Sequence, residues 1–184
     1  VKDLLYFRID RKKKILVSTL LLALGYTKND IVNEFYEKEN YSYDTNIKKW
    51  KTKFDPENYK SKNFSEEVVD AKTGKVVIKL GEKINFINAK KLFNDGLRDI
   101  FVSKESLYGK FLHSDIKFGS DENDIFKIGT EINETIIDKI LESKIYSLDI
   151  SKTNSINKGP YMLNTILNDK NNTKEEAITE IYKM

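Results

Sequence analysis

A short segment near the start of the chain concentrates the side chains that could bind a polyanion. Arginine and lysine neutralise phosphates, and an aspartate can accept a hydrogen bond from the exposed amino group of a base. A charged helix start with an intrachain arginine–aspartate ion pair would explain the same residues equally well. The candidate DNA-contacting residues are Arg8, Asp10, Arg11, Lys12, Lys13 and Lys14.

The rest of the chain offers no catalytic constellation. His113 is the only histidine, and it takes the place in one copy of an internal repeat that Ser65 takes in the other, so we expect it at the surface. Residues 73–75 lack the upstream glycine of a phosphate-binding loop, and the acidic turn at 121–124 fails the calcium-loop spacing. We therefore expect no catalytic residue, metal or cofactor in this chain.

The composition limits the classes of function. The 184 residues are 39% hydrophobic and 33% charged, which allows one domain or two small ones with a modest core. The net charge of +3 is far from that of an autonomous nucleic-acid binder, so any DNA contact must be local. The chain begins at Val1 without an initiator methionine and ends at Met184 within a helical pattern, so we expect a piece of a longer protein.

The cellular compartment is constrained by cysteine usage and by the apolar segment. The absence of cysteine excludes disulfides and cysteine-ligated zinc and is compatible with a reducing cytoplasm. The basic residues 11–14 before the apolar residues 15–24 imitate a secretory signal peptide, which would make the chain a secreted module. Ten apolar residues are too few to cross a bilayer, so we expect a soluble protein without a membrane partner.

The elements that must position the candidate residues begin with a strand and a helix. Residues up to Ile9 alternate as in a strand, and the lysines then stand before a helix that starts near Leu16 and ends at Gly25. Cations at a helix start oppose the helix dipole, which indicates that an anion lies nearby.

A second helix follows at once. Thr27 with Asp30 is a capping-box variant that starts this helix, and an apolar stripe continues it to about Lys38. Residues 15–38 could therefore form a free-standing helix-turn-helix DNA-binding protein, which is the alternative function. The acidic residues of the second helix argue against that alternative because they would repel phosphate.

Residues 39–60 predict a β-hairpin with a turn at Asp44 and a lysine-rich face from Lys49 to Lys53. We interpret the lysines as the solvated face of an edge strand, since charged edges protect sheets from aggregation. The alternative is a nucleic-acid face. The aromatic residues of the hairpin are expected in the core.

An internal duplication follows the hairpin. Residues 61–102 align with 109–150, and each copy predicts two strands, a glycine, an asparagine cap, a short helix and a last strand. We expect each copy to close its own small core and the two copies to superpose. The equivalent glycines are Gly81 and Gly129, and the equivalent caps are Asn85 and Asn133.

The end of the chain returns to helical character. The polar residues 151–158 predict a linker, and Gly159-Pro160 then starts a helix to about Leu167. Thr173 with Glu176 predicts a second capping box at the start of a final helix.

These motifs, in this order, resemble the second lobe of the bacterial DNA-directed RNA polymerase β subunit. The resemblance covers essentially the whole chain, with the duplicated region looking like a lineage-specific insertion in the lobe. It implies a segment of a nucleotidyltransferase whose catalytic site and magnesium lie elsewhere. The motifs that carry it are Phe7–Arg11 with Lys14, Leu22–Thr27, Glu37–Lys38, Gly159–Tyr161 with Thr165, and Glu180–Tyr182.

The resemblance implies one wall of the downstream DNA channel. Asp10 would lie near the non-template strand at the edge of the bubble, and Arg11, Lys12 and Lys13 would contact the DNA backbone. Relatives often carry arginine where Leu167 stands, so no DNA contact is expected from that helix. The implied partners are DNA, the α, β′, ω and sigma subunits, and transcription regulators on 39–150, all in the nucleoid-associated cytoplasm.

The expected fold class is α+β. Residues 1–38 and 151–184 would form a mostly helical lobe portion, and 39–150 an inserted domain of hairpin 39–60 and tandem ββαβ-like repeats. Because both ends of 39–150 would return to a finished lobe, we expect a short linker in its place to leave basal RNA synthesis intact and to impair only regulation.

Overall fold

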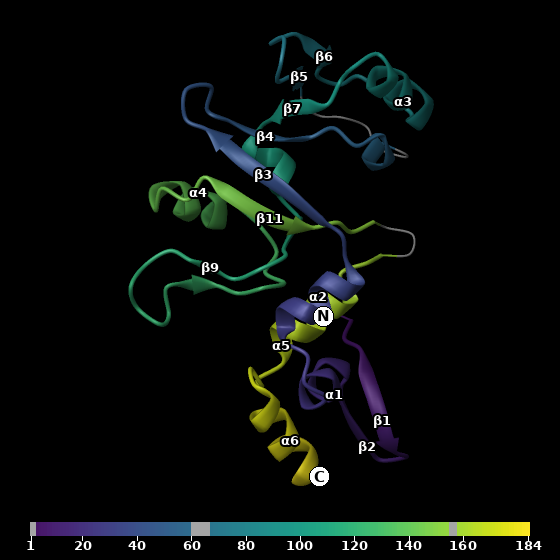
Figure 1. Cartoon of the computed structure of the whole chain (residues 1–184), viewed down its shortest axis with the longest axis vertical. Coiled ribbons are helices and arrows are strands. Elements are labelled where there is room, and N and C mark those ends of the chain that lie inside the picture. Colours follow the sequence, from purple (N-terminus) through teal and green to yellow (C-terminus); the bar gives the residue numbers. More distant parts are fainter. Residues whose placement is uncertain (1–2, 60–66, 155–157) are drawn as a thin grey trace. The chain divides into compact units, whose positions relative to one another are not determined.

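The computed structural model describes residues 3–59, 67–154 and 158–184 (Figure 1). The chain has an α+β fold, as predicted. None of the described helices is long and apolar enough to cross a membrane. The chain divides into two compact units: unit 1 contains Val1–Lys38, Gly109–Ile132 and Asp149–Met184, and unit 2 contains Glu39–Tyr108 and Asn133–Leu148.

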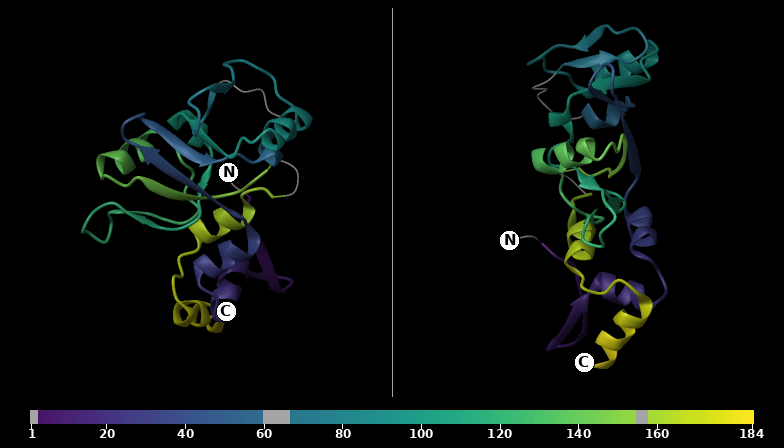
Figure 2. Two further views of the ribbon diagram at one scale, coloured as in Figure 1. Left: turned by 45° about the horizontal axis from the view of Figure 1, so that its top comes forward. Right: turned by 90° about the vertical axis from the view of Figure 1, so that its left-hand side faces the viewer.

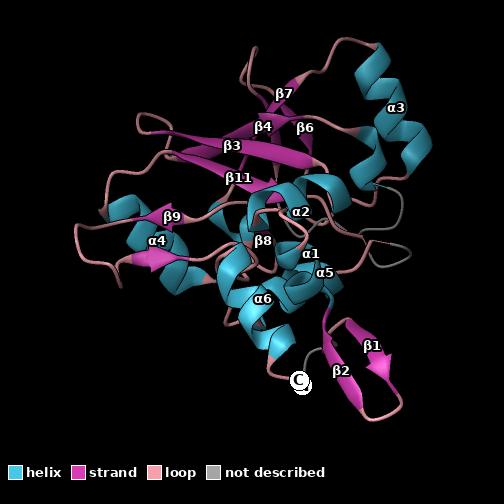
Figure 3. Cartoon of the chain, turned by 60° about the horizontal axis from the view of Figure 1, so that its bottom comes forward, coloured by secondary structure: helices cyan, strands magenta, loops and turns pink. Residues whose placement is uncertain are grey.

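Unit 1 begins with a hairpin of two strands, β1 (Tyr6–Asp10) and β2 (Lys13–Leu16), which extends from the helices of this unit (Figure 3). Leu16 is also the N-cap of helix α1 (Val17–Ala23), so the second strand runs directly into the helix. The prediction that the lysines stand at the mouth of the helix is wrong. Lys13 and Lys14 pair with the preceding strand, since a turn at Arg11-Lys12 reverses the chain.

The end of α1 follows the sequence signal. Gly25 has a φ of +103°, its N–H donates to the Leu22 carbonyl at 3.0 Å, and the N–H of Tyr26 donates to the Leu21 carbonyl at 3.1 Å. Together these two bonds form a Schellman motif, which favours glycine because of the left-handed conformation.

Helix α2 (Lys28–Phe35) begins at the predicted capping box. The Thr27 hydroxyl accepts from the Asp30 N–H at 3.1 Å, and the Asp30 carboxylate accepts from the Thr27 N–H at 2.9 Å. The helix ends before the predicted Lys38, because Tyr36 is already extended and strand β3 starts at Lys38.

Two helices close unit 1 at the end of the chain, α5 (Tyr161–Asn168) and α6 (Lys174–Tyr182). The predicted capping box of α6 is half formed. The Thr173 hydroxyl accepts from the Glu176 N–H at 3.2 Å, but the Glu176 carboxylate accepts from the N–H of Asn172 instead of that of the cap. Helices α1, α2 and α5 lie side by side (Figure 2).

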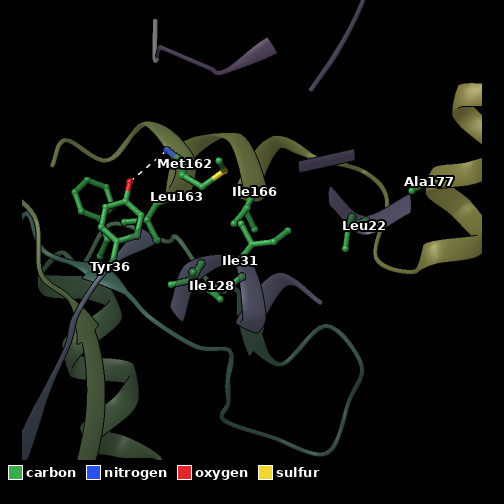
Figure 4. Close-up of a cluster of buried hydrophobic side chains, with 10 residues drawn as sticks. Leu22, Ile31, Tyr36, Ile128, Met162, Leu163, Ile166 and Ala177 are labelled. Carbon is green, nitrogen blue, oxygen red and sulfur yellow. Dashed lines mark hydrogen bonds between the residues drawn. The ribbon is translucent and has the colours of Figure 1, made fainter. Parts of the chain in front are cut away.

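The core of unit 1 lies among these helices (Figure 4). The Tyr36 hydroxyl accepts from the Met162 N–H at 3.3 Å and donates to the Gly159 carbonyl at 2.7 Å, which fixes the start of α5. Two members of the core, Phe111 and Ile128, come from the predicted insertion. The buried cluster is Leu22, Ile31, Val32, Tyr36, Phe111, Ile128, Met162, Leu163, Ile166 and Ala177.

Phe111 belongs to one of three short strands of unit 1, and Ile128 lies in the turn that follows another of them. Strand β8 (Phe111–Leu112) pairs antiparallel with the end of β11 (Ser147–Ser151), with Ile150 opposite Leu112. Strands β9 (Ile116–Lys117) and β10 (Ile125–Phe126) form a two-stranded sheet of their own. Of the predicted linker 151–158, residues 155–157 lie outside the described part, and Ser151 belongs to β11.

Unit 2 is built on an antiparallel sheet in the order β6, β5, β7, β4, β3. Of the predicted hairpin 39–60, strands β3 and β4 form the paired part up to Lys53, and Pro56–Tyr59 form a 3-10 turn instead. The Asp44 carboxylate closes the hairpin turn by accepting from the N–H groups of Asn46 and Ile47. The edge-strand prediction is wrong, because β4 lies between β3 and β7. The core prediction is confirmed for Tyr41, Trp50 and Phe54, which are buried.

The elements of unit 2 have the following bounds. The strands are β3 (Lys38–Asp44), β4 (Lys49–Lys53), β5 (Val68–Asp70), β6 (Val76–Ile78) and β7 (Asp99–Val102). The helices are the 3-10 turns η1 (Pro56–Tyr59) and η2 (Lys104–Leu107) and the α-helices α3 (Phe86–Asn94) and α4 (Glu134–Glu142).

The predicted duplication is visible in the order of the elements. Helices α3 and α4 start at equivalent positions of the two copies, each directly after the predicted asparagine. The side chain of each asparagine accepts from the N–H three positions later, at 2.8 Å for Asn85 and 3.0 Å for Asn133. Gly81 and Gly129 both have a positive φ, of 76° and 88°. Residues 61–66 of the first copy lie outside the described residues.

The two copies differ in what they pack against. In the first copy the hairpin β5–β6 joins β7 through Val69 opposite Phe101, whereas β9–β10 of the second copy stays a separate sheet. The second copy also places Ile128 in the core of unit 1. The expectation that each copy closes its own core is therefore wrong for the second. Whether 39–150 is an insertion stays a prediction.

Candidate nucleic-acid interface

The strand register sorts the candidate residues onto two faces of the β1–β2 hairpin. Arg8 lies opposite Lys14, and Asp10 lies opposite Lys13, with a bulge between the two pairs. Directly opposed residues share a face, and successive residues of a strand alternate. Arg8 and Lys14 therefore lie on one face, while Asp10 and Lys13 lie on the other, because the extra residue of the bulge shifts the alternation.

The bulge also separates the two residues that were considered as an intrachain ion pair. No ion pair joins Arg8 to Asp10, both of which lie in the described part of the chain. The Asp10 Oδ1 instead accepts from the backbone N–H of Arg11 at 2.5 Å. Asp10 thus closes the turn of the hairpin, and its Oδ2 makes no hydrogen bond with another described residue.

Some cations of the hairpin contact other groups of the chain, and others do not. The Lys13 Nζ donates to the Met184 carbonyl at 2.6 Å, and the Lys14 Nζ lies 4.1 Å from the centre of the Tyr6 ring. The side chains of Arg8, Arg11 and Lys12 are exposed and have no hydrogen-bond or ion-pair partner among the described residues. These three cations are the ones free to bind an anion.

Two cations of the hairpin also repel each other, which favours the binding of an anion between them. Arg8 and Lys14 stand directly opposite each other in the ladder, and like charges at such positions are destabilising. A phosphate bound on that face would relieve the repulsion. The arrangement can thus neutralise phosphates on one face and at the tip, while Asp10 offers a carboxylate oxygen beside them.

The anion expected near the start of α1 is part of the chain itself. The buried carboxylate of Asp169 accepts from the hydroxyls of Ser18 at 2.5 Å and Thr19 at 2.9 Å, both in the first turn of α1. A carboxylate in this position is favourable for the helix dipole. The dipole therefore gives no argument for a bound phosphate at α1.

Sequence reasoning misplaced His113. Its side chain is 4% exposed, with Nδ1 lying 2.7 Å from the Ser151 Oγ and Nε2 lying 2.6 Å from the Asn33 Oδ1. Burial lowers the pKa of the imidazole, against the opposing effect of Asp149. The comparison with Ser65 was misleading because residues 109–132 of the second copy belong to unit 1, where His113 lies against Asn33 and Ser151, and no local signal marks that burial.

The remaining candidates give no further site. The only lysine of α2, Lys28, donates to the Asp169 carbonyl at 3.3 Å and to the Asn172 side chain at 3.0 Å, so it does not extend a basic helix face. The exposed side of α2 carries Asp30 and Glu34, which disfavours the helix-turn-helix alternative. Within the described ranges, no three His, Asp or Glu side chains are grouped to hold a metal.

No protein-family model matches the chain. The chain is 37% identical over 183 residues to the DNA-directed RNA polymerase subunit beta of Rickettsia felis, and 36% identical over the same length to those of Rickettsia massiliae and Rickettsia canadensis. Each match covers 100% of this chain and 13% of the relative. The chain therefore spans only about an eighth of the length of these relatives.

Proposed function

We propose, from the homology of the whole chain to a segment of the bacterial DNA-directed RNA polymerase β subunit, that it lines the downstream DNA channel and contacts DNA through the β1–β2 hairpin. The observation that carries the proposal is the set of three exposed cations that have no hydrogen-bond or ion-pair partner in the described part of the chain, Arg8, Arg11 and Lys12. They are concentrated on one hairpin of a chain with little net charge.

The proposed mechanism is electrostatic positioning. Arg8 with Lys14 on one face, and Arg11 with Lys12 at the tip, neutralise phosphates of the duplex without reading its sequence. The free Oδ2 of Asp10 accepts from an exposed base amino group of the non-template strand. The segment contributes no catalytic group, and the polymerase would carry its magnesium and nucleotide-addition residues elsewhere.

The proposed partners follow from the same homology. Besides DNA, they are the α, β′, ω and sigma subunits, with transcription regulators binding on 39–150. Two exposed lysines of β4, Lys51 and Lys53, supply positive charge on one face of that strand for contact with an acidic regulator.

We expect Arg11→Ala in the intact polymerase to weaken the grip on downstream duplex. Removal of one phosphate-binding cation should reduce the slope of log affinity against log salt by about 1, because fewer counterions are released on binding. The measurement is the dissociation rate of promoter complexes at several salt concentrations. Lys90→Ala, which removes an exposed lysine from α3, is the control and should leave the slope unchanged. Equal slopes for all variants would contradict the proposal.

We expect Asp10→Asn to change sequence preference at the bubble edge while overall affinity is kept. The amide oxygen can still accept from the Arg11 N–H, but the second oxygen becomes an NH2 group, so a base acceptor should replace a base donor as the preferred contact. Asp10→Ala should lose both the hydrogen bond that closes the hairpin turn and the sequence preference at the bubble edge. Promoters that vary at the bubble edge measure both effects. If Asp10→Asn leaves preference unchanged, Asp10 serves only the turn.

A further inference from the structure

The first strand of the hairpin is attached to α5 by a buried hydroxyl. Thr165 is fully buried, and its Oγ1 accepts from the N–H of Leu5 at 2.9 Å and donates to the Tyr161 carbonyl at 2.7 Å. The Leu5 carbonyl accepts in turn from the N–H of Val17 at 3.0 Å, which joins the two strands at their base. Thr165 therefore holds the point at which β1 leaves the helices.

The second strand is attached through the residue four positions later. The Asp169 carboxylate binds the Ser18 and Thr19 hydroxyls in the first turn of α1, directly after β2. Its other oxygen accepts at 3.0 Å from both the backbone N–H and the side-chain amide of Asn171, so the carboxylate is fixed on its own side as well.

The hairpin depends on these attachments more than a strand of a larger sheet would. Among the described residues, strands β1 and β2 pair only with each other, and a two-stranded hairpin is marginally stable in water. Apart from the buried Ile15 and the half-buried Leu16 at its base, the residues of its strands are exposed, and Lys13 bonds to Met184. The direction in which the hairpin tip points is therefore fixed by the contacts of Thr165 and Asp169 at the base of the hairpin.

We infer that Thr165 and Asp169 are positioning residues, which orient the hairpin and thereby its free cations Arg8, Arg11 and Lys12 without touching the ligand. The inference rests on the proposed function for the ligand, a nucleic-acid backbone. The anchoring itself does not depend on that function. Both residues come from α5 and the position just after it, so one helix controls both ends of the hairpin.

The first experiment measures the anchor without DNA. Thr165→Val keeps the shape of the side chain but removes the hydroxyl, and Thr165→Ser restores it. In the assembled polymerase, hydrogen exchange of the peptide 5–16 should become about three- to tenfold faster in the valine variant, as expected when a buried hydrogen bond is removed. The serine variant should exchange at the wild-type rate, and the α3 peptide should be unchanged in all variants.

Ser18→Ala is a milder second variant, in case Thr165→Val prevents assembly. It removes one of the two hydroxyls bound to Asp169 and should also speed exchange of the hairpin. Unchanged exchange of residues 5–16 in either assembled variant, or no rescue by serine, would overturn the anchoring.

The second experiment separates positioning from a general structural effect. Thr165→Val should reduce the salt slope of promoter-complex dissociation, but it should add nothing in a variant that already lacks the three cations, Arg8→Ala, Arg11→Ala and Lys12→Ala. Additive losses would overturn the inference. If the three-cation variant itself keeps the wild-type slope, the proposed DNA contact fails, and the exchange result still decides whether Thr165 anchors the hairpin.

Discussion

Gly129→Ala should destabilise unit 1 by about 2–5 kcal/mol, because two costs combine at this position. The φ of 88° is a left-handed conformation that costs a residue with a Cβ about 1–2 kcal/mol. A Cβ would also lie 2.5 Å from the Leu163 carbonyl oxygen in α5, and forcing atoms into a packed site costs about 1–3 kcal/mol more.

Gly81→Ala is the matched control for this prediction. Its φ of 76° imposes the same backbone cost, but no atom lies within 4 Å of the added Cβ. Hydrogen exchange of α5 amides measures the local stability for Gly129→Ala, and the fluorescence of Trp50 follows unit 2 for Gly81→Ala. Equal losses of stability in the two variants would show that the left-handed backbone conformation accounts for the whole effect and that the added Cβ at position 129 makes no costly contact with α5.

Ile128→Ala should destabilise the same unit by about 2–5 kcal/mol, the usual cost of truncating a buried isoleucine. Ile128 is 3% exposed in the core formed with Ile31, Met162 and Ile166, and truncation of such a residue leaves a cavity. Exchange of amides in α2 and α5 measures the loss.

The equivalent residue of the first copy, Leu80, provides the control. Leu80 is 69% exposed, so Leu80→Ala should change the stability of unit 2 by less than about 0.5 kcal/mol. Loss of stability in both variants would mean that both turns pack in cores, and the asymmetry between the copies would have to be abandoned.

This asymmetry bears on replacing 39–150 with a linker. The replacement would remove Phe111 and Ile128 from the core of the terminal helices, together with the hydrogen bonds of His113 to Asn33 and Ser151. The terminal helices therefore do not form a finished core without 109–132. We expect these helices, and the hairpin attached to them, to be less stable in the shortened chain. Only a replacement that keeps 109–132 could leave that core intact.

The features that could be predicted from the residues alone are those whose signals are local. The caps at Thr27, Asn85 and Asn133 and the helix end at Gly25 are present because each is a bond or backbone conformation within a few positions of the chain. The repeated order of elements was readable for the same reason, since similar segments form similar local structure.

The faces and partners of these elements, in contrast, depend on contacts that form only in the folded chain. A bulge between Arg8 and Asp10 divides the candidate residues between two faces, and Asp169, near the opposite end of the chain from the hairpin, supplies the anion at α1. Burial of Ile128 but not Leu80 depends on which helices lie beside the turn. Such outcomes arise from contacts between residues far apart in the chain, which neither periodicity nor capping patterns encode.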